Sequence, residues 1–253
     1  GEHSDWAGGF RTANPSIHKG QCLVYGTDVG ITATATKSSV DGVGNLTFCE
    51  PHALEDRRLQ VAWDRAELRR IAAEGGFFSY VCGSALAAAE RLGWEAVQHC
   101  DVAFDVKSMT LPMGKGLSSS AAVCVLVARG LGQLFGHTFS TADEMELAYQ
   151  GERLTPSLCG RMDQCCAFGS KFVAMYFDGD KVTTEAVVCK GAFHFVIADL
   201  RAKKNTQVIL ARLEEAYPHA ENDLHRGVQE FLGPISFGCA EAAKQALAAG
   251  DPA

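Results

Sequence analysis

A stretch of small and hydroxylated residues, LPMGKGLSSSAAVCVL, occupies positions 111–126 and ends in an apolar run. Residues 102–111 have the alternation of a strand, and residues 119–135 have the composition of a buried helix. A strand, a glycine-rich turn and a helix start form a natural anion site, because the first N–H groups of a helix lack internal partners and carry partial positive charge. The stretch therefore indicates either a phosphate loop or a serine N-cap on a core helix.

Two familiar phosphate motifs are excluded by the positions of individual residues. A Walker A loop needs Gly-Lys-Ser/Thr at its end, whereas Lys115 stands between Gly114 and Gly116. A dinucleotide loop needs a third glycine where Ser119 stands. The loop is neither of these.

Two acidic residues follow the loop at positions suited to phosphoryl transfer, which needs a metal site and a group that orients the acceptor. Glu152 lies near the end of a predicted helix, and Asp163 lies eleven residues later, after Gly160. Magnesium takes one or two carboxylates and keeps water and phosphate oxygens as its other ligands. Taken singly, Glu152 also fits a solvated helix face and Asp163 a helix start, so both interpretations stay open.

The N-terminal segment GEHSDWAGG, residues 1–9, gathers three polar side chains before a glycine turn. Glu2, His3 and Asp5 have the groups needed to hold the hydroxyls of a polar substrate. A frayed, solvated terminus is the other interpretation. Composition does not decide between them.

Helices and strands alternate along the chain, which predicts an α/β or α+β class. The candidate binding and catalytic residues named above lie in or beside these elements. We expect short strands within residues 20–37 and a hairpin over 171–189 with its turn at residues 178–180. A capping box of Thr141 and Glu144 predicts the start of the helix that ends near Pro156. Further predictions are a helix over 78–92, a strand over 192–200, a helix over 206–220 and mainly helix over 221–247, interrupted at 233–238.

The composition bounds the class of protein. The 253 residues carry a formal charge of −7, which argues against a nucleic-acid partner. The ten cysteines are scattered without a C-x-x-C pair, so we expect reduced thiols and a cytoplasmic protein. No stretch approaches the ~18 apolar residues of a membrane span, and no secretory leader is visible, so we expect no membrane partner.

Three motifs in order resemble the GHMP kinase superfamily, which includes galactokinase, homoserine kinase and the mevalonate kinases. GEHSDWAGG resembles the sugar signature of galactokinases, LPMGKGLSSSAA the phosphate loop and CGRMDQ the segment that holds their catalytic aspartate. AYQGERL, residues 148–154, is more similar to the mevalonate kinase version of the helix that supplies a magnesium carboxylate. The resemblance covers residues 1 to about 215.

The resemblance implies an α+β, two-domain GHMP kinase fold. Residues 1–188 would form the N-terminal domain, like domain 2 of ribosomal protein S5, and residues 189–253 the start of a ferredoxin-like C-terminal domain. Asp163 would be the catalytic carboxylate, and Ser120 and Glu152 the ligands of Mg²⁺. The remaining roles implied are sugar binding by Glu2, His3, Asp5 and Gly160, and ATP binding by Gly114, Lys115, Gly116, Leu117, Ser118, Ser119 and Ser120.

The sequence also departs from the family pattern. The family's upstream arginine and its third glycine-rich motif are not found between Gly1 and Ala253, so we expect the chain to be part of a longer protein. Arg161 replaces an apolar residue beside Asp163, where it either alters substrate choice or faces solvent. His18 and Lys19, in a longer loop, belong either to a different sugar pocket or to the loop alone.

The resemblance implies an ATP-dependent kinase that phosphorylates a sugar hydroxyl, with the anomeric hydroxyl favoured by the first motif. A non-sugar alcohol such as mevalonate is the alternative acceptor, suggested by AYQGERL. A non-catalytic sensor of sugar and ATP on the same fold is the alternative from another class. The sequence predicts no oligomeric state.

Overall fold

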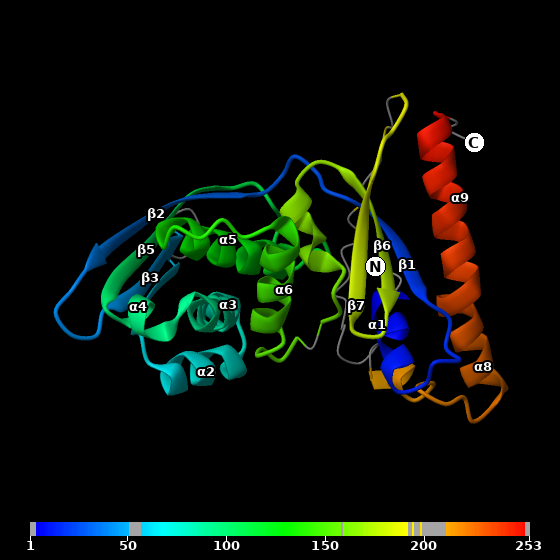
Figure 1. The fold of residues 1–253 in the computed structure, drawn as a ribbon, viewed down its shortest axis with the longest axis horizontal. Coiled ribbons are helices and arrows are strands. Elements are labelled where there is room, and N and C mark those ends of the chain that lie inside the picture. Colours follow the sequence, from blue (N-terminus) through cyan, green and yellow to red (C-terminus); the bar gives the residue numbers. More distant parts are fainter. Residues whose placement is uncertain are drawn as a thin grey trace. The chain divides into compact units, whose positions relative to one another are not determined.

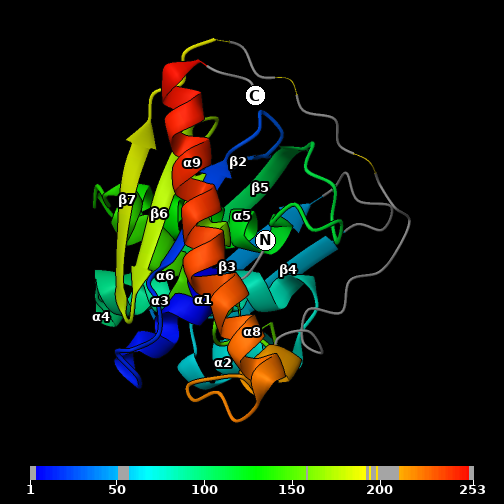
Figure 2. The same cartoon turned by 90° about the vertical axis from the view of Figure 1, so that its right-hand side faces the viewer.

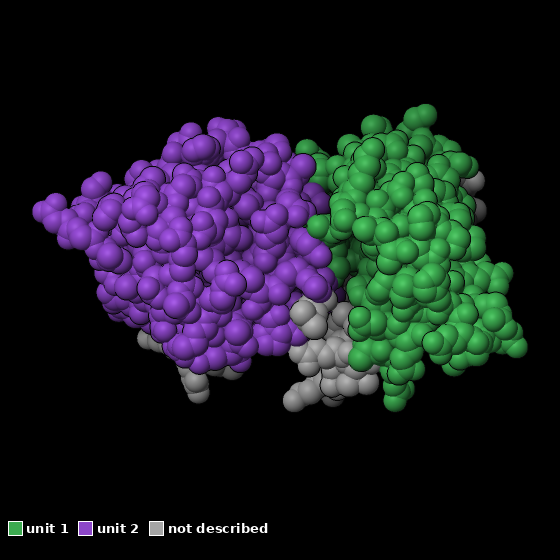
Figure 3. Space-filling model, turned by 60° about the horizontal axis from the view of Figure 1, so that its bottom comes forward, with its two compact units in different colours: residues 1–27, 160–253 green, residues 28–159 purple. Residues whose placement is uncertain are grey.

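The computed structural model describes residues 4–50, 57–157, 159–191, 194, 198 and 211–250 (Figure 1). Two compact units divide the chain, coloured separately in Figure 3. Unit 1 comprises residues 1–27 and 160–253, and unit 2 comprises residues 28–159. Because the chain leaves unit 1 and later returns to it, its first and last segments build one body.

Unit 2 is a four-stranded sheet with helices (Figure 1). The strand order is β2-β5-β3-β4, and β3 pairs parallel with β5 while the two other pairings are antiparallel. Its strands are β2 (Ile31–Ser39), β3 (Asn45–Glu50), β4 (Arg57–Ala62) and β5 (Cys100–Met109). Its helices are α2 (Arg65–Glu74), α3 (Phe77–Leu92), α4 (Trp94–Gln98), α5 (Ser119–Leu134) and α6 (Thr141–Glu152).

The core of unit 2 lies between the sheet and its helices. Every second residue of β5 from Cys100 to Val106 is buried, as expected for a strand with one face in the core. Phe48 of β3 and Phe104 of β5 stack in this core with ring centroids 6.1 Å apart. A Cβ on Gly130 would meet the ring of Phe104, so α5 lies directly on the sheet. The strand that precedes the serine loop and the helix that follows it are therefore both fixed by packing.

Unit 1 is built on a three-stranded antiparallel sheet of order β1-β6-β7 (Figure 1). Its strands are β1 (Gly20–Tyr25), β6 (Phe172–Asp178) and β7 (Lys181–Val187). Its other elements are α1 (Ser4–Gly9), the 3₁₀ turns η1 (Phe10–Thr12) and η2 (Asp163–Phe168), α8 (Asp223–Glu230), the π-helical turn η3 (Phe231–Ile235) and α9 (Ser236–Ala249). The segment carrying Asp163 thus leads directly into the central strand of this sheet.

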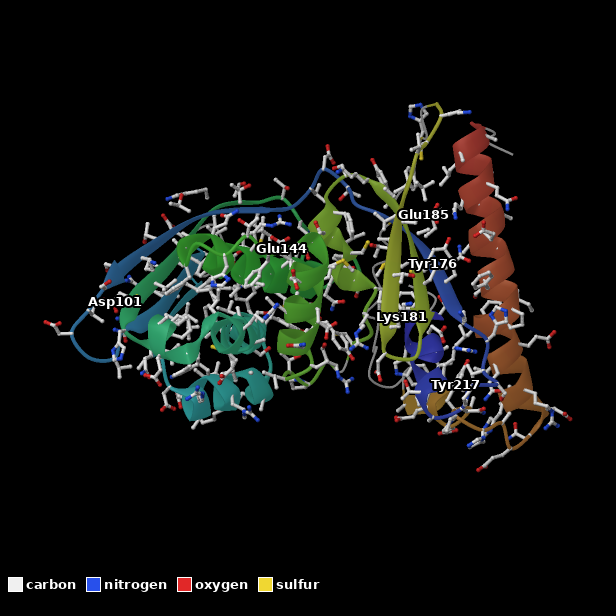
Figure 4. The ribbon with its side chains drawn as sticks, viewed as in Figure 1. Asp101, Glu144, Tyr176, Lys181, Glu185 and Tyr217 are labelled. Atoms are coloured by element: carbon white, nitrogen blue, oxygen red, sulfur yellow. The ribbon has the colours of Figure 1, made fainter. Side chains whose placement is uncertain are left out.

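Helix α9 lies along the sheet of unit 1 and is tied to it by polar contacts (Figures 1 and 2). Lys244 Nζ donates to the hydroxyl of Tyr176 at 2.9 Å and to Glu185 Oε2 at 2.7 Å; the latter two residues are labelled in Figure 4. Leu247 is buried within the same helix. Lys244 therefore links α9 to both β6 and β7.

The observed elements confirm most of the local predictions. The predicted mixture of helices and strands is confirmed, as are the strands around residues 26–28, the hairpin turn between β6 and β7, and the interruption between α8 and α9. The capping box lies one residue earlier than predicted: Ser140 is the N-cap of α6, and its side chain exchanges hydrogen bonds with Asp143. Two neighbouring hydroxyl–carboxylate pairs fit the same spacing, and sequence does not distinguish them.

Some predictions fall outside what the structure describes. Most of the predicted strand over 192–200 and the start of the predicted helix over 206–220 lie outside the described residues. The predicted domain boundary between residues 188 and 189 stays a prediction. Within the described part of the chain, no helix is long and apolar enough to cross a membrane.

Candidate active site

The glycine-serine loop of unit 2 joins β5 to α5 and takes an unusual backbone path. Gly114 and Gly116 have φ angles of 66° and 76°, values that side-chain-bearing residues rarely adopt. Both glycines and Lys115 are exposed, whereas Leu117 is half-buried. The two glycines are thus needed for the turn itself, and the turn leaves the loop backbone open to a ligand.

Ser118 is the N-cap of α5 and has a left-handed conformation, with φ 58° and ψ 34°. It has the only positive φ among the described non-glycine residues. A left-handed residue other than glycine costs on the order of 1 kcal/mol, and such strain gathers at functional sites. Its side chain makes no capping hydrogen bond. The N-cap interpretation therefore does not account for this serine, and its hydroxyl is available to a ligand.

Glu152 is the last residue of α6, and only 1% of its surface is exposed. A negative charge at the C-terminal end of a helix is opposed by the helix dipole, and burial opposes it further. Ser157 Oγ donates to its Oε1 at 3.4 Å. A solvated helix face is therefore wrong for this residue, and a bound cation would offset the opposing terms.

Tyr80 of α3 is close to both α5 and α6. Cys124 Sγ donates to the carbonyl oxygen of Tyr80 at 3.7 Å. Burial raises the pKa of the Tyr80 hydroxyl, and the charge of Glu152 raises it further. Glu152 thus lies near the Tyr80 hydroxyl, and Cys124, one helical turn after Ser120 on α5, contacts the backbone of the same tyrosine.

The two ligands predicted for Mg²⁺ fit that ion in chemical type. A hydroxyl from Ser120 and a carboxylate from Glu152 are hard oxygen donors, and Mg²⁺ usually takes one or two carboxylates together with substrate phosphates. Among the described residues no group of three or more His, Cys, Asp or Glu side chains could hold a metal ion. Phosphate oxygens of a bound nucleotide would therefore have to complete the coordination.

Asp5 and the segment of Asp163 come together in unit 1. The Asp5 side chain is buried, and its Oδ2 accepts a hydrogen bond from the backbone N–H of Met162 at 3.2 Å. Gly160 lies against the same carboxylate. Asp163 is half-buried at the start of η2, followed by the buried Gln164. Glu2 and His3 lie outside the described residues.

Helix α1, which carries Asp5, is held tightly to the sheet. Ser4 Oγ donates to the carbonyl of Gln21 on β1 at 2.8 Å, and the N–H of Gly179 donates to the carbonyl of Gly8 at 3.0 Å. A Cβ on Gly8 would lie 2.8 Å from the backbone nitrogen of Gly20, which is closer than real Cβ contacts allow. The sheet therefore fixes the position of the Asp5 side chain.

The loop after α1 is anchored by a charge cluster that sequence reasoning missed. Arg11 Nε lies 2.6 Å and Lys19 Nζ 2.7 Å from the carboxylate of Asp178. Lys19 and then Arg11 lower the pKa of Asp178 to about 2. His18 packs edge-on against Phe237 of α9, with ring centroids 5.0 Å apart. Lys19 thus has a structural partner within the loop's own unit, whether or not it also meets a substrate.

The predicted residues thus form two groups, one in each unit. The loop residues, Ser120 and Glu152 belong to unit 2, and Asp5, Gly160 and Asp163 belong to unit 1. Their assigned roles stay predictions. Sequence reasoning missed Tyr80, because a tyrosine inside an apolar helix carries no signal of the carboxylate near it.

Part of the chain matches a known protein family. Residues 79–170, from α3 through the loop and both acidic residues to the end of η2, match the family described as GHMP kinases N terminal domain. No curated protein sequence matches the chain. The solved structures described next are below 25% identical to this chain, so they establish similarity of fold.

Three of these structures are enzymes named as kinases. Galactokinase of Lactococcus lactis, complexed with galactose, is 16% identical with a TM-score of 0.63 over 99% of this chain and 67% of that chain. Mevalonate kinase of Methanococcus jannaschii is 14% identical with a TM-score of 0.51, over 85% and 69%. The D-glycero-D-manno-heptose 1-phosphate kinase of Bacteriodes thetaiotaomicron is 17% identical with a TM-score of 0.50, over 97% and 70%.

The fold and the family match agree with each other. The similarity extends over nearly the whole chain and supports the mixed α and β, two-domain fold implied by the motifs. This chain spans about two thirds of the length of the galactokinase and of the mevalonate kinase. Residues 79–170 match the N-terminal domain of GHMP kinases, and the similarity of the rest of the chain to these enzymes is one of fold.

Proposed function

We propose that the protein transfers the γ-phosphoryl group of ATP to a hydroxyl of a sugar, with the anomeric hydroxyl as the acceptor. One observation carries this proposal: Asp5, from the galactokinase-like N-terminal motif, is held against the segment that bears Asp163. The motif assigned to sugar recognition and the motif assigned to activation of the sugar hydroxyl thus meet within one unit. The similarity in fold to a galactokinase complexed with galactose supports the same substrate class.

Asp163 is assigned the task of orienting and deprotonating the acceptor. The acceptor oxygen forms a bond to the γ-phosphorus, its proton passes to the Asp163 carboxylate, and the bond from the γ-phosphorus to the bridging oxygen of ADP breaks. Glu2, His3, Asp5 and Gly160 are assigned to the sugar hydroxyls. A carboxylate is suited to the first task because it accepts the proton as the nucleophile forms.

The loop is assigned to the phosphates of ATP. The backbone of Gly114 and Gly116, the exposed charge of Lys115 and the N–H groups at the start of α5 would surround the phosphate oxygens. Leu117, Ser118 and Ser119 continue this binding surface, and the Ser118 hydroxyl is not used in capping. These groups would stabilise the negative charge that spreads over the transferring phosphoryl group in the transition state.

Ser120 and Glu152 are assigned to Mg²⁺ bound together with ATP. When bound, this ion would neutralise charge on the phosphate oxygens. The burial of Glu152 at a helix C-terminus is the structural observation that supports its assignment. We propose a cytoplasmic location as well, in keeping with ten free cysteines and the acidic composition.

A kinase of a non-sugar alcohol is the second candidate, favoured by the AYQGERL segment and by the fold similarity to a mevalonate kinase. A sensor that binds sugar and ATP without turnover is the third. Transfer of phosphate to a sugar, to mevalonate or to neither separates the three candidates in a single panel of acceptors.

The decisive experiment follows ADP release with ATP, Mg²⁺ and a panel of sugars and alcohols, using the wild type, Asp163→Ala and the control Asp41→Ala. Asp41 is an exposed loop residue of unit 2. We expect Asp163→Ala to abolish sugar-dependent ADP release while ATP binding, measured by calorimetry, changes little. Asp41→Ala should behave as the wild type. Unchanged turnover in Asp163→Ala would contradict the assignment of Asp163 as the catalytic carboxylate.

A further inference from the structure

The carboxylate of Asp5 makes contacts that a ligand of sugar hydroxyls does not need. Only 7% of the surface of Asp5 is exposed, although aspartate is rarely buried without partners. Its Oδ2 accepts from the backbone N–H of Met162, 157 residues along the chain and directly before Asp163. The N-terminal motif is thus joined to the catalytic segment by a hydrogen bond between a charged acceptor and the main chain.

Gly160 makes a second, steric contact with the same carboxylate. The three heavy atoms nearest to a Cβ built on Gly160 all belong to Asp5: Oδ2, Cγ at 2.8 Å and Oδ1 at 3.3 Å. Gly160 does not have the positive φ that would by itself require glycine. Glycine is therefore needed here for space, because the Asp5 carboxylate fills the volume of a side chain at position 160.

The two contacts bracket the turn from Gly160 to Met162. Asp5 itself is fixed, because α1 is tied to β1 through Ser4 and to the β6–β7 turn through Gly8. From the other side, Asp163 opens η2, which leads into β6 of the same sheet. The turn is thus held between α1, which is tied to β1, and η2, which leads into β6, with the Asp5 carboxylate as the contact on the α1 side.

We propose that Asp5 is a positioning residue: it holds the turn 160–162 and thereby sets the carboxylate of Asp163 for the reaction. This inference rests on the proposed function, since it gives Asp163 the catalytic role. It adds a task to Asp5, which the motif alone assigns only to sugar hydroxyls. An Asp5 that acts only as a sugar ligand is the competing account, and the experiments below separate the two.

Hydrogen exchange tests the contact without reference to activity. Asp5→Ala removes the acceptor of the Met162 N–H, so we expect exchange in the peptide 159–168 of the whole protein to accelerate by about tenfold. Asp5→Asn keeps an amide oxygen at the same place and should remain nearer to the wild type. Unchanged exchange in Asp5→Ala, with the fold intact by circular dichroism, overturns the positioning role.

A double-mutant cycle tests the steric contact. In the wild type, Gly160→Ala places a methyl group on the Asp5 carboxylate and shifts the turn, so kcat should fall by about 100-fold with little change in the KM for ATP. In the Asp5→Ala background the methyl group has room, and Gly160→Ala should reduce kcat by less than about threefold more. If the double variant loses kcat by the product of the two single-variant factors, the proposal is overturned.

The matched control is Gly227→Ala, at a helical glycine of α8 where a Cβ meets nothing within 4 Å. It should leave kcat and both KM values unchanged.

Asp5→Asn distinguishes positioning from a sugar contact that depends on the charge. We expect it to recover a larger share of kcat than Asp5→Ala, because its amide oxygen still accepts from Met162; equal kcat losses in the two variants contradict the inference.

Failure of the proposed function and failure of the positioning role of Asp5 give different results. A wild-type protein that phosphorylates no acceptor ends the proposed function, and with it the catalytic part of this inference, whatever the exchange data show. An active wild type whose Asp5→Ala variant loses only sugar affinity, with kcat retained, ends the inference and leaves the proposed function in place.

Discussion

Arg129 of α5 and Glu144 of α6 form a two-point ion pair, with Nε to Oε1 at 2.9 Å and Nη2 to Oε2 at 2.6 Å. Glu144, labelled in Figure 4, is nearly buried, and Arg129 is partly exposed. The helix that begins after the serine loop is thereby joined to the helix that ends at Glu152. The pair therefore stabilises the spacing between the two groups assigned to the phosphates and the metal.

Replacing Arg129 with methionine should destabilise unit 2 by about 1 to 2 kcal/mol, because a mostly buried carboxylate loses its partner. Urea unfolding measures the change. Arg70→Met is the matched control, since Arg70 forms exposed pairs with Glu67 and Glu74 within α2. It should cost less than about 0.5 kcal/mol. Equal losses in the two variants would show that burial of Glu144 contributes nothing.

Ser118 permits a separation of backbone strain from hydroxyl chemistry. Ser118→Gly relieves the left-handed conformation, so it should be more stable than Ser118→Ala by about 1 kcal/mol. Both variants lose the hydroxyl, and both should raise the KM for ATP by about tenfold if that group binds phosphate. Melting temperature and ATP kinetics measure the two effects. A normal KM in both variants would leave the strain without a role in ATP binding.

Glu152→Gln should affect metal dependence without destabilising the metal-free protein. Burial and the helix dipole oppose the charge of Glu152, so its removal should leave the melting temperature in EDTA unchanged or higher. The Mg²⁺ concentration for half-maximal activity should rise by about tenfold or more. Glu146→Gln, on the same helix and bonded to Gln150, is the control and should change neither value. A metal-free Glu152→Gln that melts well below the wild type would contradict the prediction.

The free energy of unfolding should fall with rising pH above about 9. Burial raises the pKa of the Cys82 thiol from 9.0 to about 12. Between these values the unfolded chain releases a proton that the folded protein keeps, so each such thiol contributes a loss of up to about 1.4 kcal/mol per pH unit. Urea unfolding between pH 8 and pH 11 measures the slope.

Cys82→Ala should make this slope shallower, whereas the control Cys239→Ala, at an exposed position on α9, should leave it unchanged. Cys165 contributes in the same direction, because burial also raises its pKa to about 12. A slope in Cys82→Ala that equals the wild-type slope would show that this thiol ionises alike in both states.

Local structure was largely predictable because it depends on residues close in sequence. The glycines of the serine loop, the hairpin turn around Gly179 and the break before α9 at Pro234 each restrict the backbone where they stand. The capping box lies one residue before its predicted place, because neighbouring hydroxyl–carboxylate pairs satisfy the same local rule. The motif order also pointed to the family, which the match over residues 79–170 supports.

By itself, the sequence determined the mixed class and the residue types available for chemistry, and its motifs indicated the resemblance to GHMP kinases. Only the tertiary structure decided that β1 and β2, neighbours in sequence, belong to different sheets, and that Glu152 is buried beside Tyr80. It also decided that Asp5 supports the turn before Asp163. The contact of Asp5 with Met162 joins residues 157 positions apart. Such contacts arise from packing of whole elements, which no local pattern of residues encodes.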